Sequence, residues 1–183
     1  PKCGYSALNR FFNYMTSTQA KLIKEQISNN FKGTPDEGEI LTYDEAIARH
    51  KLALVNTIVK KGKISERAYI CLKLAWLIRG KTETLPADTP DYEQVKKELA
   101  GEELEFLSKA YEGFMSAFEK ELFPMCGMDE ITITYLIADL ARRCGRYEEA
   151  SRWVSRVLIS REANERIKAK ARDIKELIQN EKN

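Results

Sequence analysis

The sequence has almost no signal for β-structure. No Asn-Gly or Asp-Gly pair joins alternating apolar segments, as it would in a typical β-hairpin. Most apolar residues instead recur at intervals of three and four, which places them on one face of a helix. The sequence therefore predicts an all-α protein.

Charge of one sign and long apolar runs are also missing. Thirty basic residues nearly balance 28 acidic ones, leaving a net charge of +2, so we do not expect nucleic acid to be the main partner. No apolar run approaches the roughly 20 residues that cross a bilayer, and no basic-then-apolar leader precedes the first expected helix. We expect a cytoplasmic protein without a membrane partner, although Pro1 is not a natural start and an upstream leader stays open.

Enzyme motifs and a disulfide framework are absent as well. The chain has no Gly-rich phosphate loop, no Ser-centred nucleophile elbow and no His-Glu-x-x-His. Its one histidine, His50, lies on an apolar side of its expected helix, which favours a packed, hydrogen-bonded residue over a catalytic one. Cys71 and Cys144 lie within apolar helical patterns, as buried free thiols do in a reducing compartment. We therefore expect no enzyme activity and no cofactor on this chain.

Turn and capping signals divide the chain into helical segments. Thr42 and Glu45 form a capping box, and Gly62 and Gly145 each mark a tight turn inside a helical hairpin. The expected segments are Thr18–Asn29, the hairpin Tyr43–Arg79, the long segment Asp91–Leu122, the hairpin Thr132–Ser160 and the final helix Glu162–Gln179. These segments predict antiparallel helices joined by short loops.

Four boundaries follow from single residues. Ser65 is the expected N-cap of the second helix of the first hairpin, and the segment from Gly80 to Pro90 is the expected linker. Thr89 would cap the next helix, with Pro90 in its first turn, where the missing N–H costs nothing. A break in that helix is expected near Gly101.

One segment resembles the turn and second helix of tetratricopeptide (TPR) repeats. It runs from Gly145 to Ala150 and continues with Val154, Val157 and Leu158. A glycine makes the turn, an aromatic residue packs across it, and an alanine lies where two helices approach closely. This resemblance implies a short stack of TPR-like antiparallel hairpins, although the usual closing proline is missing. The final helix, apolar on one side and charged on the other, would serve as the C-terminal capping helix.

The amino end carries a second resemblance. Residues Pro1 to Ala7 read PKCGYSA, similar to the second half of a Cys-Pro-x-Cys-Gly-Tyr-x-Ala zinc knuckle whose first cysteine would precede Pro1. Together with the helical pairs, this resembles an uncharacterised prokaryotic family, domain of unknown function family 2225, which joins a zinc ribbon to a TPR-like region. The resemblance implies a ribbon remnant and connector over 1–17 and a TPR-like domain over 18–183. Cys3 would then bind zinc only in the intact protein, because a closed site needs all its ligands.

The resemblance also indicates where a partner would bind. Tyr135, Asp139, Arg142 and Arg143 occupy, with Thr132, the side of a helix that TPR-like stacks often turn toward their groove. The two arginines could hold a partner's carboxylate by bidentate hydrogen bonds, or could simply stabilise the negative end of their helix.

The leading hypothesis is therefore a protein-protein interaction or scaffold module that binds a protein or peptide. One alternative is a helical hydrolase or transferase that uses His50 and carboxylates. The other is a zinc-dependent nucleic-acid adaptor in the full-length protein. The sequence indicates no oligomeric state.

Overall fold

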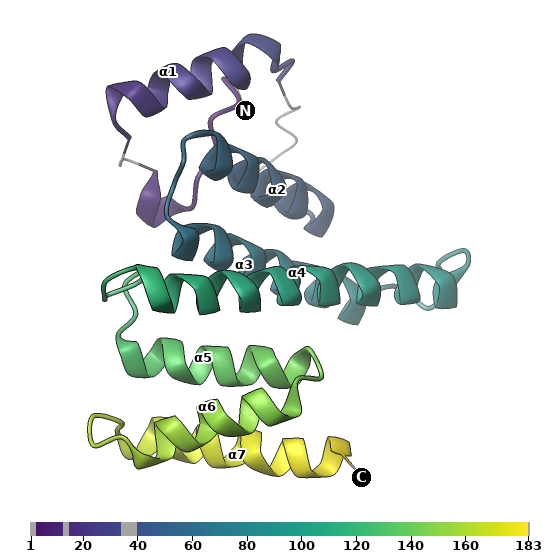
Figure 1. Cartoon of the computed structure of the whole chain (residues 1–183). Coiled ribbons are helices and arrows are strands. Elements are labelled where there is room, and N and C mark those ends of the chain that lie inside the picture. The colour runs from purple at the N-terminus through teal and green to yellow at the C-terminus, as the bar shows by residue number, and fades with distance from the viewer. Residues whose placement is uncertain (1–2, 13–14, 34–39, 183) are drawn as a thin grey trace.

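The computed structural model describes residues 3–12, 15–33 and 40–182, and these residues form a stack of helices (Figure 1). In chain order the elements are η1 (Asn9–Phe11), α1 (Ser17–Gln26), η2 (Ser28–Asn30), α2 (Tyr43–Val59), α3 (Ile64–Glu83), α4 (Tyr92–Lys120), α5 (Glu130–Arg143), α6 (Tyr147–Ile159) and α7 (Glu165–Lys182). The described residues contain no strand beyond an isolated bridge between Met125 and Met128. The all-α prediction is confirmed.

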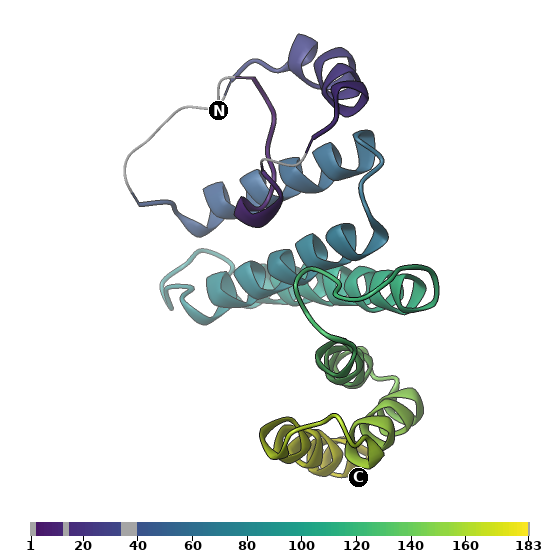
Figure 2. The ribbon, with the colours of Figure 1, turned by 90° about the vertical axis from the view of Figure 1, so that its left-hand side faces the viewer.

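Each helix packs mainly on its neighbours along the chain. The pairs α2–α3, α3–α4, α5–α6 and α6–α7 make the largest contacts, and α5 also touches α7. Figures 1 and 2 show α1 and α2 at one end of the stack, α3 and α4 in the middle, and α6 and α7 at the other end. Most of the largest fully buried side chains, among them Phe114 and Ile70, lie in the central α3–α4 layer and in α5 and α6.

Helix α2 begins at its predicted capping box. The Thr42 hydroxyl accepts a hydrogen bond from the Glu45 amide at 3.3 Å, and the Glu45 carboxylate accepts one from the Thr42 amide at 2.7 Å. The hydrogen bond from that backbone amide lowers the pKa of Glu45. Both orphan N–H groups are thus satisfied by residues three positions apart.

Helix α3 does not begin as predicted, and Ser65 is not its N-cap. The helix starts at Ile64, with no capping bond from the side chain of Lys63. The carboxylate of Glu121, just beyond α4, accepts hydrogen bonds from the Ile64 amide at 2.6 Å and from the Ser65 hydroxyl at 2.5 Å. The cap is therefore supplied from a distant part of the chain.

The predicted linker also begins too early. Helix α3 continues through Gly80 to Glu83, and a Cβ atom on Gly80 would lie 2.7 Å from the Tyr43 ring. Glycine at this position allows Tyr43 of α2 to approach α3 and does not end the helix.

The start of α4 differs from the Thr89–Pro90 cap that was predicted. The N-cap is Asp91, which has a φ of +54° and makes no side-chain capping bond, and the helix begins at Tyr92. The break predicted near Gly101 is also wrong, since α4 runs unbroken to Lys120. The long segment is therefore a single helix, which packs on α3 and α5.

The last two helices follow the prediction more closely. Gly145 makes the turn between α5 and α6 with a φ of +71°, a conformation that favours glycine. Helix α7 starts at Glu165, three residues later than predicted, where the Asn164 side chain accepts a hydrogen bond from the Ile167 amide at 2.9 Å. In the described ranges, each helix is too short or too polar to cross a membrane.

A candidate partner-binding face on α5

Helix α5 has one face in the core and one polar face. Its first turn is capped by Asp129, whose carboxylate accepts a hydrogen bond from the Thr132 amide at 2.8 Å. Hydrogen bonds from the Thr132 side chain and amide lower the pKa of Asp129, so the cap is ionised at neutral pH. Ile133 and Ile137 are fully buried. This packing fixes which residues of α5 point away from the core.

The four predicted binding residues lie on that polar side, and three of them line two pockets. Tyr135 lines a smaller pocket of about 320 Å³. Arg142 and Arg143 line a larger pocket of about 480 Å³. Asp139 lies between them in sequence and bonds both arginines. Helical spacing therefore places the predicted residues on one side of α5, along which there are two separate pockets.

The smaller pocket lies between the first halves of α5 and α7. Its lining consists of Thr132, Tyr135, Asn164, Arg166, Ile167 and Lys170. The Lys170 ammonium is 5.9 Å from the centroid of the Tyr135 ring, within reach of a cation–π contact. Burial, helped by the charge of Asp139, raises the pKa of Tyr135, so its phenol stays a hydrogen-bond donor at neutral pH. The pocket combines an aromatic surface with positive charge.

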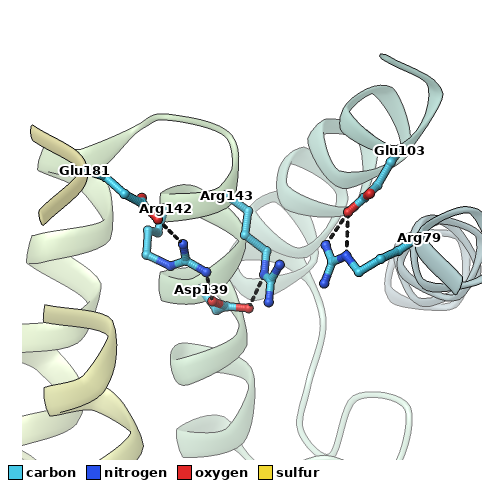
Figure 3. A network of polar contacts seen from close by, with 6 residues as sticks. All are labelled: Arg79, Glu103, Asp139, Arg142, Arg143 and Glu181. Carbon is cyan, nitrogen blue, oxygen red and sulfur yellow. Dashed lines mark hydrogen bonds and ion pairs between the residues drawn. The ribbon is translucent and has the colours of Figure 1, made fainter. Parts of the chain in front are cut away.

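The larger pocket lies where parts of five helices meet near the turn between α5 and α6. Its lining consists of Arg79, Glu103, Leu104, Leu107, Arg142, Arg143, Cys144, Gly145, Tyr147 and Glu181. Burial raises the pKa of Cys144, which keeps its thiol protonated. Figure 3 shows the charged groups of this pocket together with Asp139, in two separate sets of hydrogen bonds.

Asp139 holds the two arginines of α5 in place. Its carboxylate accepts hydrogen bonds from Arg142 at 3.0 Å and from Arg143 at 2.8 Å. Arg142 also donates to Glu181 of α7 at 2.6 Å, and only 10% of its side chain is exposed. Arg142 thus uses both terminal nitrogens within the chain and links α5 to α7. The Arg143 side chain is 32% exposed and is bonded to Asp139 through Nε, so it is the better placed of the two for a partner.

Two charged residues that α3 and α4 contribute to the larger pocket had not been predicted. Arg79 of α3 donates to Glu103 of α4 from Nε at 2.8 Å and also from one terminal nitrogen (Figure 3). Their side chains are 28% and 17% exposed. Nothing in the local sequence indicates that they lie beside the end of α5, because only the packing of α4 on α5 brings them there.

The other candidate residues lie away from this face. The His50 Nδ1 atom is 2.8 Å from the Ala46 carbonyl oxygen, one turn earlier in α2, and the residue is half-buried. Cys3 is an exposed free thiol. Within residues 3–12, 15–33 and 40–182, no group of three or more His, Cys, Asp or Glu side chains could hold a metal ion.

The fold and this face together define an all-α protein of stacked helices with a polar, pocketed side along α5 and α7. The family described as "Uncharacterized protein conserved in bacteria (DUF2225)" matches residues 1–178, and the chain belongs to this family. No curated protein and no solved structure matches the chain. The family resemblance is thus confirmed. The zinc ribbon, the TPR-like arrangement and the cytoplasmic location stay predictions.

Proposed function

We propose that this chain is a protein-interaction module that binds a peptide or helix of another protein along α5. The observation that supports the proposal is that one polar face of α5 reaches two pockets, of about 320 and 480 Å³, at the two ends of the helix. Helix α7 contributes to both of them, through Ile167 and Lys170 at one end and Glu181 at the other. An extended or helical segment lying along α5 would reach both pockets.

The side chains of this face are held in place before a partner arrives. Asp139 fixes Arg143, and Lys170 lies over the ring of Tyr135. Ordering long side chains on binding costs free energy, and side chains that are already ordered avoid much of that cost. The face offers an aromatic ring and guanidinium groups, which are common anchors in protein interfaces. A TPR-like stack, which presents its first helices on a concave side, would use α5 in this way.

Selection from a random peptide library followed by affinity measurement would test the proposal. We expect selected peptides to lose at least roughly tenfold in affinity with Tyr135→Ala and with Arg143→Ala, because each removes an anchor. Arg142 is left intact, since it is bonded to both Asp139 and Glu181 and its loss would disturb the fold.

Arg172→Ala is the matched control. Arg172 is on α7, is 55% exposed, and is not part of either pocket lining. Its replacement should leave the affinity unchanged. If the library yields no binder, or if binders are insensitive to both Tyr135→Ala and Arg143→Ala, the proposed face is wrong.

A further inference from the structure

Two guanidinium groups face each other across the larger pocket (Figure 3). Arg79 uses Nε and one terminal nitrogen to bind Glu103, and Arg143 uses Nε to bind Asp139. In the described part of the chain, the other terminal nitrogen of Arg79 and both terminal nitrogens of Arg143 have no hydrogen-bond acceptor. An anion between the two groups would accept hydrogen bonds from these unused N–H donors.

The unused N–H donors of the pocket favour an anion of low charge. Its lining has three arginines and two glutamates, and Asp139, which bonds two of these arginines, adds a third carboxylate, so the charges balance at 3 − 3 = 0. A carboxylate adds a single negative charge to this neutral group, and arginine binds carboxylates through two parallel N–H donors. A doubly charged phosphate would add twice that charge and would face the carboxylates of Glu103 and Glu181. The chemistry of the lining therefore favours a carboxylate.

Apolar side chains lie beside the arginines. Leu104, which is 47% exposed, and Leu107 belong to the same lining. A half-exposed leucine next to a charged site can bury an aliphatic group of the ligand. The C-terminal residue of a peptide has this composition, since its carboxylate and its own side chain leave the same Cα atom. A glutamate or aspartate within a peptide has no apolar group at that position.

We propose that the larger pocket binds the C-terminus of a partner peptide. The terminal carboxylate lies between Arg79 and Arg143, and an aliphatic last side chain packs on Leu104. Asp139 and Glu103 are positioning residues that aim the two guanidinium groups. This inference rests on the proposed function and deepens it, because it names the part of the partner that this end of the face recognises.

Titration of ¹⁵N-labelled protein with short peptides, followed by NMR, tests the assignment. The probes are acetyl-Ala-Ala-Leu with a free carboxylate, the same peptide as its C-terminal amide, acetyl-Ala-Glu-Ala-amide, and inorganic phosphate. We expect the free acid to shift the Nε–H signals of Arg79 and Arg143 in a saturable way. The amide should bind roughly tenfold more weakly or not at all, because it lacks the charge that the arginines bind.

Variants separate hydrogen bonding from charge. Arg79→Gln should weaken binding of the free acid roughly tenfold. Arg143→Lys keeps the charge but loses the planar pair of donors, and it should weaken binding by a similar factor. Arg172→Gln, at an exposed site outside the pocket, should have no effect. The same spectra report whether each variant is folded.

Several results would overturn the inference. Equal shifts with acid and amide, shifts confined to other parts of the chain, or tighter binding of acetyl-Ala-Glu-Ala-amide or phosphate would each show that the pocket does not select a peptide C-terminus. If the free acid fails while selected peptides still depend on Tyr135, the C-terminal anchor is wrong and the proposed face stands. If neither experiment gives a signal, both are wrong.

Discussion

At the residue scale, the least exposed ion pair among the residues that the structure describes joins the end of α2 to the start of α3. The Lys60 ammonium is 2.8 Å from the Glu66 carboxylate, and their side chains are only 3% and 10% exposed. The Thr57 hydroxyl donates to the same carboxylate oxygen at 3.3 Å. Removing two charges from water costs several kcal/mol, and the cost is offset only while both partners are present.

Replacing one partner of this pair should therefore destabilise the protein strongly. We expect Lys60→Met to lower the free energy of unfolding by about 3 kcal/mol, because it leaves a buried carboxylate unpaired. The double variant Lys60→Met/Glu66→Met should cost much less than the sum of the two single variants, since it removes both charges. Urea unfolding followed by circular dichroism measures these changes.

A surface ion pair supplies the control. Lys21 and Glu25 are 3.9 Å apart, and their side chains are 76% and 53% exposed. Lys21→Met should change the free energy of unfolding by less than about 0.5 kcal/mol. If Lys60→Met changed stability as little as Lys21→Met does, the buried pair would have no special role in joining α2 to α3.

At the scale of the element, two glycines within α4 have opposite surroundings. A Cβ atom added to Gly101 would meet no atom within 4 Å. A Cβ atom added to Gly113 would lie 2.7 Å from the Ala68 Cβ atom and 3.3 Å from its Cα atom. Gly113 thus allows α3 and α4 to approach closely, whereas Gly101 has no contact that requires glycine.

Alanine at these two positions should change stability in opposite directions. Gly101→Ala should raise the free energy of unfolding by about 0.5–1 kcal/mol, because alanine has the higher helix propensity. Gly113→Ala should lower it by about 1–3 kcal/mol, because the added methyl group overpacks the contact with Ala68. Chemical denaturation of both variants gives the two signs. Stabilisation by Gly113→Ala would mean that α3 and α4 can separate at little cost.

The sequence predictions were accurate where the residues that determine a helix end or a turn lie close together along the chain. The cap of α2 joins Thr42 and Glu45, and the turn at Gly145 depends on its own backbone conformation, so local patterns were sufficient. The start of α3 depends on Glu121, and α3 continues through Gly80 at the point where Tyr43 of α2 packs against it. Local signals carry no information about such contacts.

At the scale of the whole molecule, the candidate site also combines residues that a local pattern brings together with residues that only the packing of helices brings together. Tyr135, Asp139 and Arg143 belong to a single helix, so helical spacing alone brings them to one side of α5. Arg79 and Glu103 join the site through the packing of α3 and α4, which depends on how the whole stack is assembled. The sequence predicted which side of α5 to consider, whereas the charged residues that α3 and α4 contribute could be identified only from the structure.

The helices of the stack also differ greatly in how much apolar surface they bury. Ile23 is the one buried residue of α1, whereas α3 has nine buried residues and α4 has seven. Because each helix packs mainly on its neighbours, an end helix can open without disrupting the middle of the stack. The terminal helices should therefore be less stable than the central pair.

Hydrogen–deuterium exchange resolved by peptide mass spectrometry would measure this gradient. We expect the slowest exchange in α3 and in the part of α4 around Phe114, and the fastest helical exchange in α1. Ile23→Ala should speed exchange in α1 and leave α7 unchanged, because α1 and α7 lie at opposite ends of the stack. If Ile23→Ala accelerated exchange equally in all helices, the chain would open as one cooperative unit and not helix by helix. A local response would instead leave the α5–α7 face intact while the amino end opens, so that partner binding and opening of α1 would be independent.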